Sequence, residues 1–158
     1  MTATFKIGNA TVHRVIEQEP CDGFDAFSFF PLLTKEIVAE NADWKPKFIT
    51  PDNKLVLCIQ SYLVRTGKQN ILIDTCVGNH KERPARAFWH QMKSKQYEQN
   101  LAATGLSVND IDVVMCTHLH VDHVGWNTML VDGQWVPAFP NARYLFGRVE
   151  FVHWSKQT

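Results

Sequence analysis

Short runs of alternating apolar and polar residues, rich in β-branched side chains and bounded by turn residues, recur along the chain. Such runs are typical of β-strands, because successive side chains of a strand point to opposite faces. They predict six strands, at residues 4–7, 11–17, 55–65, 71–74, 112–116 and 143–146. The segment Val131-Asp132-Gly133-Gln134-Trp135 predicts a further, smaller hairpin, because Asp-Gly supplies the positive φ angles of a two-residue type I′ turn.

One long helix is predicted between Pro84 and Gly105. Proline suits the first turn of a helix, because its missing N–H would have no partner there, and glycine commonly ends a helix. Phe88, Trp89 and Met92 fall on one face of this helix. We expect that face to pack on the sheet.

Three shorter segments lie outside these elements. A weaker helical pattern covers residues 34–42, and Ser107 is expected to cap a short turn over residues 108–110. The segment between Cys21 and Pro31 holds four phenylalanines without a helical or strand period, so it is expected to be an ordered loop. Two roles stay open for these rings: they pin the loop to the core or to a partner subunit, or they contact substrate directly.

The size and composition are those of one soluble globular domain. The chain has 158 residues, of which 45% are hydrophobic and 20% charged, so a single domain over residues 1–158 is expected. Its 16 basic residues balance 16 acidic ones, which argues against nucleic acid or an anionic membrane as a partner. The most basic run, residues 81–86, is expected to form a solvated turn.

The sequence indicates neither a targeting signal nor a disulfide framework. The first residues lack the continuous apolar stretch of a signal peptide, and no run reaches the ~18 apolar residues that a spanning helix needs. We therefore expect a cytoplasmic protein. The four cysteines are scattered without a Cys-x-x-Cys pair, which favours free thiols over disulfides or a zinc ribbon.

The segment His118-Leu119-His120-Val121-Asp122-His123 places three imidazoles and a carboxylate side by side. Independent placement would produce this pattern in fewer than about one in a thousand such chains. Imidazole and carboxylate are ligands that zinc prefers, and the segment follows directly on a predicted strand. The sequence therefore predicts a metal site here.

The spacing divides these ligands into two pairs. If the strand ends just before the motif, His118 and His120 project to the same side of an extended backbone, so together they can bind one ion. Asp122 and His123 come after the chain turns and could face a second ion beside the first. A helix beginning at Asp122 would help to keep its carboxylate ionised. Cys116, on the preceding strand, is expected to be a packing thiol rather than a ligand.

These residues resemble a known family. Residues 117–125, Thr-His-Leu-His-Val-Asp-His-Val-Gly, resemble the signature of metallo-β-lactamase-fold hydrolases, and Ile71-Leu72-Ile73-Asp74-Thr75 resembles their buried Asp-Thr motif. The order of strands, helix and motifs is also that of the family, so the resemblance covers residues 55–146. Residues 74–80 and 125–127 are similar to the branch that contains organophosphate hydrolases and acyl-homoserine lactonases.

The resemblance implies an α+β fold, namely the N-terminal half of an αβ/βα sandwich with a mixed, mostly antiparallel sheet and flanking helices. It implies two Zn²⁺ ions per complete site, the first bound by His118 and His120 and the second by Asp122 and His123. Asp74 would lie behind these ligands and steady their loop. Asp122 is thereby predicted to be both a zinc ligand and a catalytic residue.

The activity that the resemblance implies is hydrolysis of a small-molecule ester, lactone or organophosphate by a metal-bound hydroxide, because zinc can lower the pKa of bound water to about 7. The family's remaining ligands lie well downstream of the motif, and His153 comes too soon to match them, so the chain is expected to be truncated at its C-terminus. The uncovered face of the sheet predicts a homo-oligomer or association through that face. Two alternatives stay open: a non-catalytic metal-binding or interaction module, and a thioester hydrolase or nuclease of the same superfamily.

Overall fold

The chain folds into two compact units. In the computed structural model, which describes residues 3–43 and 45–157, one unit comprises residues 1–17 and 60–158 and the other residues 18–59. Strands β2 (Ala10–Cys21) and β3 (Leu57–Arg65) have residues in both units. The expected single domain over residues 1–158 stays a prediction.

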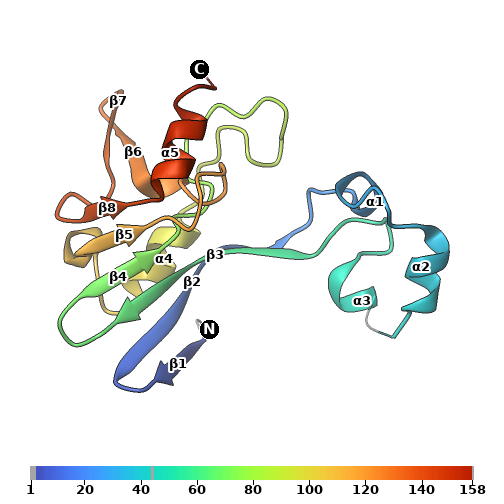
Figure 1. The fold of residues 1–158 in the computed structure, drawn as a ribbon, viewed down its shortest axis with the longest axis horizontal. Helices are drawn as coiled ribbons and strands as arrows, with labels where there is room; N and C mark the ends of the chain where they lie inside the picture. The colour runs from blue at the N-terminus through green and yellow to red at the C-terminus, as the bar shows by residue number, and fades with distance from the viewer. Residues whose placement is uncertain (1–2, 44, 158) are drawn as a thin grey trace. The chain divides into compact units, whose positions relative to one another are not determined.

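A six-stranded sheet is the main element of the larger unit (Figure 1). Its strands follow the spatial order β1-β2-β3-β4-β5-β8. Besides β2 and β3 they are β1 (Thr4–Ile7), β4 (Asn70–Ile73), β5 (Val113–Met115) and β8 (Arg143–Leu145). All six predicted strands are confirmed, although β2 runs further toward its carboxyl end than expected.

The sheet is mixed, as the α+β fold implies. β1 pairs antiparallel with β2, and β3 with β4, whereas β4 pairs parallel with β5 and β5 with β8. Alternate residues of β3 are buried, among them Ser61 and Leu63 on either side of the half-exposed Tyr62. This period of two is the one that the sequence pattern predicts for a strand with one face on the core.

Three parallel strands bring their carboxyl ends to one edge of the sheet. The register aligns Ile73 of β4 with Met115 of β5, and Met115 with Leu145 of β8. The segments that begin at residues 74, 116 and 146 therefore leave the sheet next to one another. Such an edge is where open sheets with parallel strands commonly bind their ligands.

A separate antiparallel hairpin is formed by β6 (Thr128–Val131) and β7 (Gln134–Pro137). The two residues of its turn, Asp132 and Gly133, have φ angles of 49° and 79°. These are the left-handed values that a type I′ turn requires. The predicted hairpin is therefore confirmed.

The long helix predicted between Pro84 and Gly105 is wrong, because only α4 (Gln96–Ala102) is an α-helix in this stretch. The residues before α4 fold back as a loop, across which Asn79 and Ser94 exchange two hydrogen bonds of 2.7 and 3.0 Å. In a continuous helix the N–H of Gln91 would bond within the helix, whereas it donates to Lys81 O at 2.9 Å. The long-range pairing therefore overrides the local helical pattern.

The two large aromatic side chains of this loop differ in burial. Trp89 is 2% exposed, whereas Phe88 is 37% exposed. Their rings meet edge to face with centroids 5.2 Å apart. The apolar pattern at these positions thus reflects a loop anchored by one buried ring rather than the buried face of a helix.

Two shorter predictions are confirmed. Helix α2 (Lys35–Glu40) begins after Thr34, whose hydroxyl accepts the N–H of Ile37. The 3-10 helix η1 (Val108–Asp110) begins after Ser107 in a reciprocal capping box.

Helix α5 (Arg148–Trp154) has no counterpart among the predicted elements. No helix of the described residues is both long enough and apolar enough to cross a membrane.

The smaller unit contains three short helices, which are α1 (Ala26–Phe29), α2 and α3 (Lys45–Phe48). Its core consists of four buried apolar side chains: Ala26, Val38, Ile49 and Leu55. Phe24 and Phe27 pack against this core, whereas Phe29 and Phe30 are about half exposed. The phenylalanine-rich segment is therefore ordered and partly pinned to the core, and a role of its exposed rings in binding stays a prediction.

Large apolar side chains are also exposed along β8 and α5 of the larger unit. They include Leu145, Phe146, Val149, Phe151 and Val152. The rings of Phe146 and Phe151 stack on each other with centroids 5.7 Å apart. Association of the chain through an uncovered face stays a prediction.

Candidate metal centre

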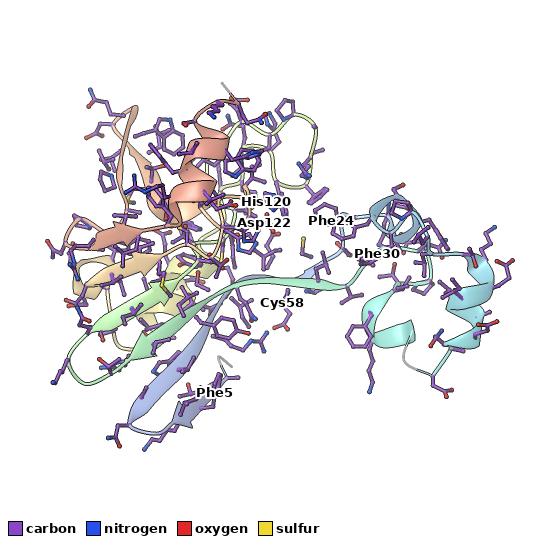
Figure 2. The ribbon with its side chains drawn as sticks, viewed as in Figure 1. Phe5, Phe24, Phe30, Cys58, His120 and Asp122 are labelled. Carbon is purple, nitrogen blue, oxygen red and sulfur yellow. The ribbon has the colours of Figure 1, made fainter. Side chains whose placement is uncertain are left out.

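The predicted ligands lie where the parallel strands end. Asp74 follows β4 directly, and residues 117–123 follow β5 after Cys116. The rings of His118 and His123 lie 3.9 Å apart between centroids, and those of His118 and His120 lie 4.5 Å apart. The structure thus brings the three imidazoles into one cluster, and Figure 2 shows His120 and Asp122 close together at this end of the sheet.

The ligands form two pairs of donor atoms. His118 Nε2 lies 3.0 Å from His120 Nδ1, and His123 Nε2 lies 3.5 Å from Asp122 Oδ2. Two ligands at about 2.0–2.1 Å from one tetrahedral zinc are about 3.3–3.4 Å apart, so both distances are close to those of ligands that share an ion. The same 3.0 Å also suits an N–H···N hydrogen bond between the two rings in the metal-free chain.

Asp74 contacts this cluster through Thr117 and His123. Its Oδ1 accepts the N–H of Thr117 at 2.8 Å, and its Oδ2 accepts the hydroxyl of Thr117 at 2.8 Å. Asp74 Oδ2 also lies 2.9 Å from Nδ1 of His123. This contact has ion-pair distance without the direction of a hydrogen bond. Nδ1 of His123 is buried, and it has no hydrogen-bond partner among the described residues. The carboxylate therefore lies on the Nδ1 side of His123, and Nε2 is directed toward Asp122.

Thr75 joins the two loops that carry Asp74 and the histidines. Its side chain is fully buried, its N–H donates to the carbonyl of His123 at 2.7 Å, and its hydroxyl lies 2.9 Å from Oδ1 of Asn127. Asn127 in turn donates to the sulfur of Cys116 at 3.4 Å. Cys116 is thus a buried packing thiol, as expected, and none of the four cysteines, all of which lie in the described residues, forms a disulfide.

The same two loops cross in direct backbone contact at Gly78 and Gly125. A Cβ at Gly125 would lie 1.8 Å from the carbonyl oxygen of Val77, and one at Gly78 would lie 2.5 Å from the carbonyl carbon of Gly125. Gly125 N–H donates to Cys76 O at 2.8 Å across this crossing. Only glycine permits such an approach, so the glycine after the histidine motif has a packing reason.

A helix beginning at Asp122, which would help to keep its carboxylate ionised, is not formed. Residues 121–123 form a turn, which is followed by the 3-10 helix η2 (Gly125–Asn127). The backbone hydrogen bonds that would continue a helix are instead made to the neighbouring loop, since Trp126 N–H donates to Thr75 O at 2.8 Å. No α-helix dipole therefore acts on the Asp122 carboxylate.

Glu17 is a buried acid that sequence reasoning missed. It is 3% exposed, and its two oxygens accept the N–H groups of Val77 and Gly78 at 2.8 and 2.9 Å and the indole N–H of Trp126 at 2.6 Å. Burial raises the pKa of Glu17, and the three hydrogen bonds together with Arg83 oppose that rise. The carboxylate thus ties both crossing loops to β2. An acidic residue in an alternating strand pattern looks the same in the sequence whether its carboxylate is buried and accepts hydrogen bonds or is exposed to solvent.

The basic run at residues 81–86 is not a fully solvated turn. Lys81 is half-buried, and its Nζ donates to the hydroxyl of Thr128 at 2.7 Å and lies 3.6 Å from the centroid of the Trp135 ring. Burial, followed by repulsion from Arg83, lowers the pKa of Lys81 to about 8. The expected solvated turn is therefore wrong at Lys81 and at Arg83, which is also half-buried.

The ligand types in this cluster suit a divalent cation, and their donor atoms lie close together in two pairs. Across residues 3–43 and 45–157, no three His, Cys, Asp or Glu side chains are grouped so that they could hold a metal ion. Three imidazoles and a carboxylate nevertheless supply the ligand types that zinc prefers. The buried Nδ1 of His123, beside Asp74, fits a ligand whose other nitrogen faces a metal. The arrangement therefore fits two half-sites of two protein ligands each.

A cavity of about 320 Å³ opens beside the motif rather than at it. Its lining includes Asn79, His80, Trp126 and Thr128. None of the predicted ligands lines it, and neither does Asp74. The cavity lies next to the motif along the chain, through Trp126, but it is separate from the donor atoms.

Comparison with known proteins identifies the family. The family model described as the metallo-beta-lactamase superfamily matches residues 59–156, which is more than half of the chain. No curated protein matches the chain.

Three solved structures have similar folds. A probable metal-dependent hydrolase from Staphylococcus aureus is 22% identical with a TM-score of 0.76, over 98% of this chain and 52% of that one. AidC, a dizinc quorum-quenching lactonase, is 25% identical with a TM-score of 0.73, over 97% and 47%. The hydrolase AbOPH of the beta-lactamase superfamily is 26% identical with a TM-score of 0.69, over 97% and 46%.

The chain spans about half the length of these three proteins. At 22% identity, the likeness to the staphylococcal protein shows the fold alone. The mixed sheet with its flanking helices thus matches part of the metallo-beta-lactamase fold. Because the family model covers more than half of the sequence and the fold agrees with it, the chain belongs to the metallo-beta-lactamase superfamily.

Proposed function

We propose that this chain carries the metal-binding part of a zinc-dependent hydrolase that acts on small esters, lactones or organophosphates. His118 and His120 bind one zinc, and Asp122 and His123 bind the second. The observation that carries this proposal is the presence of two donor pairs, at 3.0 and 3.5 Å, at the carboxyl ends of the parallel strands. Both separations are close to the about 3.3–3.4 Å expected for two ligands of one tetrahedral ion.

Bound zinc supplies a water of lowered pKa and polarises the oxygen of the substrate carbonyl or phosphoryl group. The chain's own residues prepare the site for it. Asp74 lies at Nδ1 of His123, which leaves Nε2 as the nitrogen directed toward Asp122. Asp122 contributes to catalysis as a ligand rather than as a free base, because its carboxylate faces His123 at 3.5 Å.

The substrate class is supported by membership of a hydrolase superfamily and by one similar structure. AidC is a dizinc lactonase, and its structure contains the product N-hexnoyl-L-homoserine. It is 25% identical to this chain over 97% of the chain's length. We therefore propose lactones as the first substrates to test, with small esters and organophosphates next.

The proposal is tested by zinc binding and turnover of the 158-residue chain. The wild-type chain is expected to bind close to two zinc ions, and His118→Ala and Asp122→Ala are each expected to lose one of them. The matched control is His153→Ala, because His153 is exposed on α5 and its ring contacts the neighbouring Trp154 ring rather than the proposed ligands. Native turnover by both ligand variants when saturated with zinc would overturn the assigned roles.

A second candidate function is a metal-binding module without turnover. It is favoured because the part of the chain that the structure describes offers two protein ligands for each proposed ion, whereas structural zinc sites use four and catalytic sites three. Weak, sub-stoichiometric zinc binding without hydrolysis of any lactone or ester would favour this module over the enzyme.

A further inference from the structure

The backbone of the ligand segment is held at every second residue. Asp74 accepts the N–H of Thr117 at 2.8 Å, and Glu150 Oε2 accepts the N–H of Leu119 at 3.0 Å. Arg83 Nη2 donates to the carbonyl of Val121 at 3.0 Å. These three anchored residues alternate with the proposed ligands along the chain, and their partners come from three separate segments. Of the three partners, only Asp74 is predicted from the sequence.

Glu150 joins α5 to the first pair of histidines. Leu119 lies between His118 and His120, so the hydrogen bond to its N–H restricts the backbone on both sides. The same oxygen of Glu150 accepts the indole N–H of Trp154 at 3.3 Å. The Trp154 ring meets the His120 ring nearly at right angles, with centroids 5.7 Å apart. Glu150 thus restrains His120 twice, through the backbone and through this ring.

Arg83 joins the loop after β4 to the turn that carries the second pair. Its Nη2 donates to Val121 O and Val77 O, both at 3.0 Å. Its Nε is buried and has no hydrogen-bond partner within residues 3–43 and 45–157, so the guanidinium is held by these two carbonyls and by nearby charge. Burial lowers the pKa of Arg83 and the charge of Arg86 adds to this effect, whereas the carboxylates of Glu17 and Asp122 oppose it. Val121 directly precedes Asp122, so the contact fixes the start of the second pair.

We propose that Glu150 and Arg83 are positioning residues of the metal centre. Glu150 sets the geometry of the His118 and His120 pair, and Arg83 sets that of the Asp122 and His123 pair. The inference rests on the proposed function, because it concerns the affinity of these pairs for zinc. Outer partners that orient metal ligands typically change metal affinity by 10- to 100-fold when they are removed, and two-ligand half-sites have no third protein ligand to compensate.

Zinc affinity, measured by competition with a chromophoric chelator, tests the role of Glu150. Glu150→Ala is expected to weaken zinc binding by about 10- to 100-fold, whereas Glu150→Gln keeps an acceptor for Leu119 N–H and recovers most of the loss. Glu98→Ala is the matched control, because Glu98 is also an acid in the first turn of a seven-residue helix, on α4, and lies on the cavity instead of the motif. Equal affinity for Glu150→Ala and Glu98→Ala would overturn the role.

Double variants separate positioning from a general effect on the fold. If Glu150 acts on the first pair, Glu150→Ala costs no further affinity in a His120→Ala background, where that pair is already lost. Arg83→Met is expected to keep its full effect in that background and to lose it in an Asp122→Ala background. Arg86→Met is its control, since Arg86 belongs to the same loop and lies 5.8 Å from the centroid of Trp89. A uniform loss in every background would identify a merely structural role.

Hydrogen exchange in the metal-free chain provides a measurement that does not depend on zinc. The amide of Leu119 is expected to be protected in the wild type and in Glu150→Gln, and to exchange faster in Glu150→Ala. Rapid exchange in the wild type would overturn the inference, and so would unchanged protection in Glu150→Ala. If the wild-type chain binds no zinc at all, the proposed function fails as well. If it binds zinc and the variants bind equally well, only this inference fails.

Discussion

Replacing Gly125 by alanine tests whether the crossing of two loops organises the site. The added Cβ would lie 1.8 Å from Val77 O, 1.9 Å from Val77 C and 2.4 Å from Gly78 N. All three are backbone atoms, so no side chain can rotate away to make room. An ordinary contact begins near 3.4 Å, and the loops would therefore have to separate by about 1.6 Å at the closest point.

That separation breaks the hydrogen bonds at the crossing. The bonds from Gly125 N–H to Cys76 O and from Trp126 N–H to Thr75 O are both 2.8 Å long, and an added 1.6 Å removes them. A buried donor or acceptor left without a partner costs about 1–3 kcal/mol. Two such losses lower the free energy of unfolding by about 2–6 kcal/mol, which is a large part of the about 5–15 kcal/mol of a typical domain.

Urea unfolding, followed by tryptophan fluorescence and far-UV circular dichroism, measures the effect. Gly147→Ala is the steric control, because its φ is −64° and its Cβ would meet nothing closer than Glu150 Cγ at 3.9 Å. Gly105→Ala is the backbone control, because its φ of +82° carries strain of about 1–2 kcal/mol without any neighbouring atom. A Gly125→Ala chain that unfolds within about 1 kcal/mol of Gly147→Ala would refute the tight crossing.

Three further predictions concern single side chains. Glu17→Gln is expected to lower the free energy of unfolding by about 1–3 kcal/mol, because an amide nitrogen cannot accept the buried N–H groups now bonded to the carboxylate; an unchanged urea midpoint would contradict this. Lys81 has a pKa of about 8 in the folded chain, against the ordinary value of 10.5, so the folded state loses its proton first. The free energy of unfolding, relative to that of Lys81→Met, should therefore rise between about pH 8 and 10.5. An NMR titration of the Lys81 amine with a midpoint near 10.5 would disprove that shift. Ser107→Ala removes the hydroxyl that accepts Asn109 N–H and donates to the Asp110 carboxylate at the start of η1. The free energy of unfolding, measured by thermal unfolding, is expected to fall by about 1 kcal/mol, and an unchanged stability would contradict the cap.

Local sequence patterns predicted the features whose geometry depends on interactions within one short segment of the chain. The alternation within β3 follows from the geometry of one strand, and the Asp132-Gly133 turn follows from the φ angles that these two residues tolerate. The cap at Ser107 involves atoms only three residues apart. Each of these predictions is confirmed because no distant contact opposes it.

The spacing of the ligands along the chain predicts their pairing. The expectation that a helix dipole keeps the Asp122 carboxylate ionised does not hold. A helix beginning there would have used its dipole, whereas the turn bonds to the loop after β4 instead. The proximity of His118 to His120 follows from their two-residue spacing. The contact of His123 with Asp74 could be anticipated only through the family resemblance, because these residues lie on different strands' loops.

The sequence by itself determined the strands, the hairpin and a cluster of residues of the types that bind metals, since each of these depends on period or composition within about ten residues. The tertiary structure alone decided the path of the loop before α4, which Asn79 and Ser94 close against its helical pattern. It also decided the roles of Glu17 and Glu150, whose partners lie 109 and 31 residues away in the chain. The sequence pattern around a charged side chain does not predict which distant group that side chain will bind. The partner depends on how the whole sheet brings its loops to one edge.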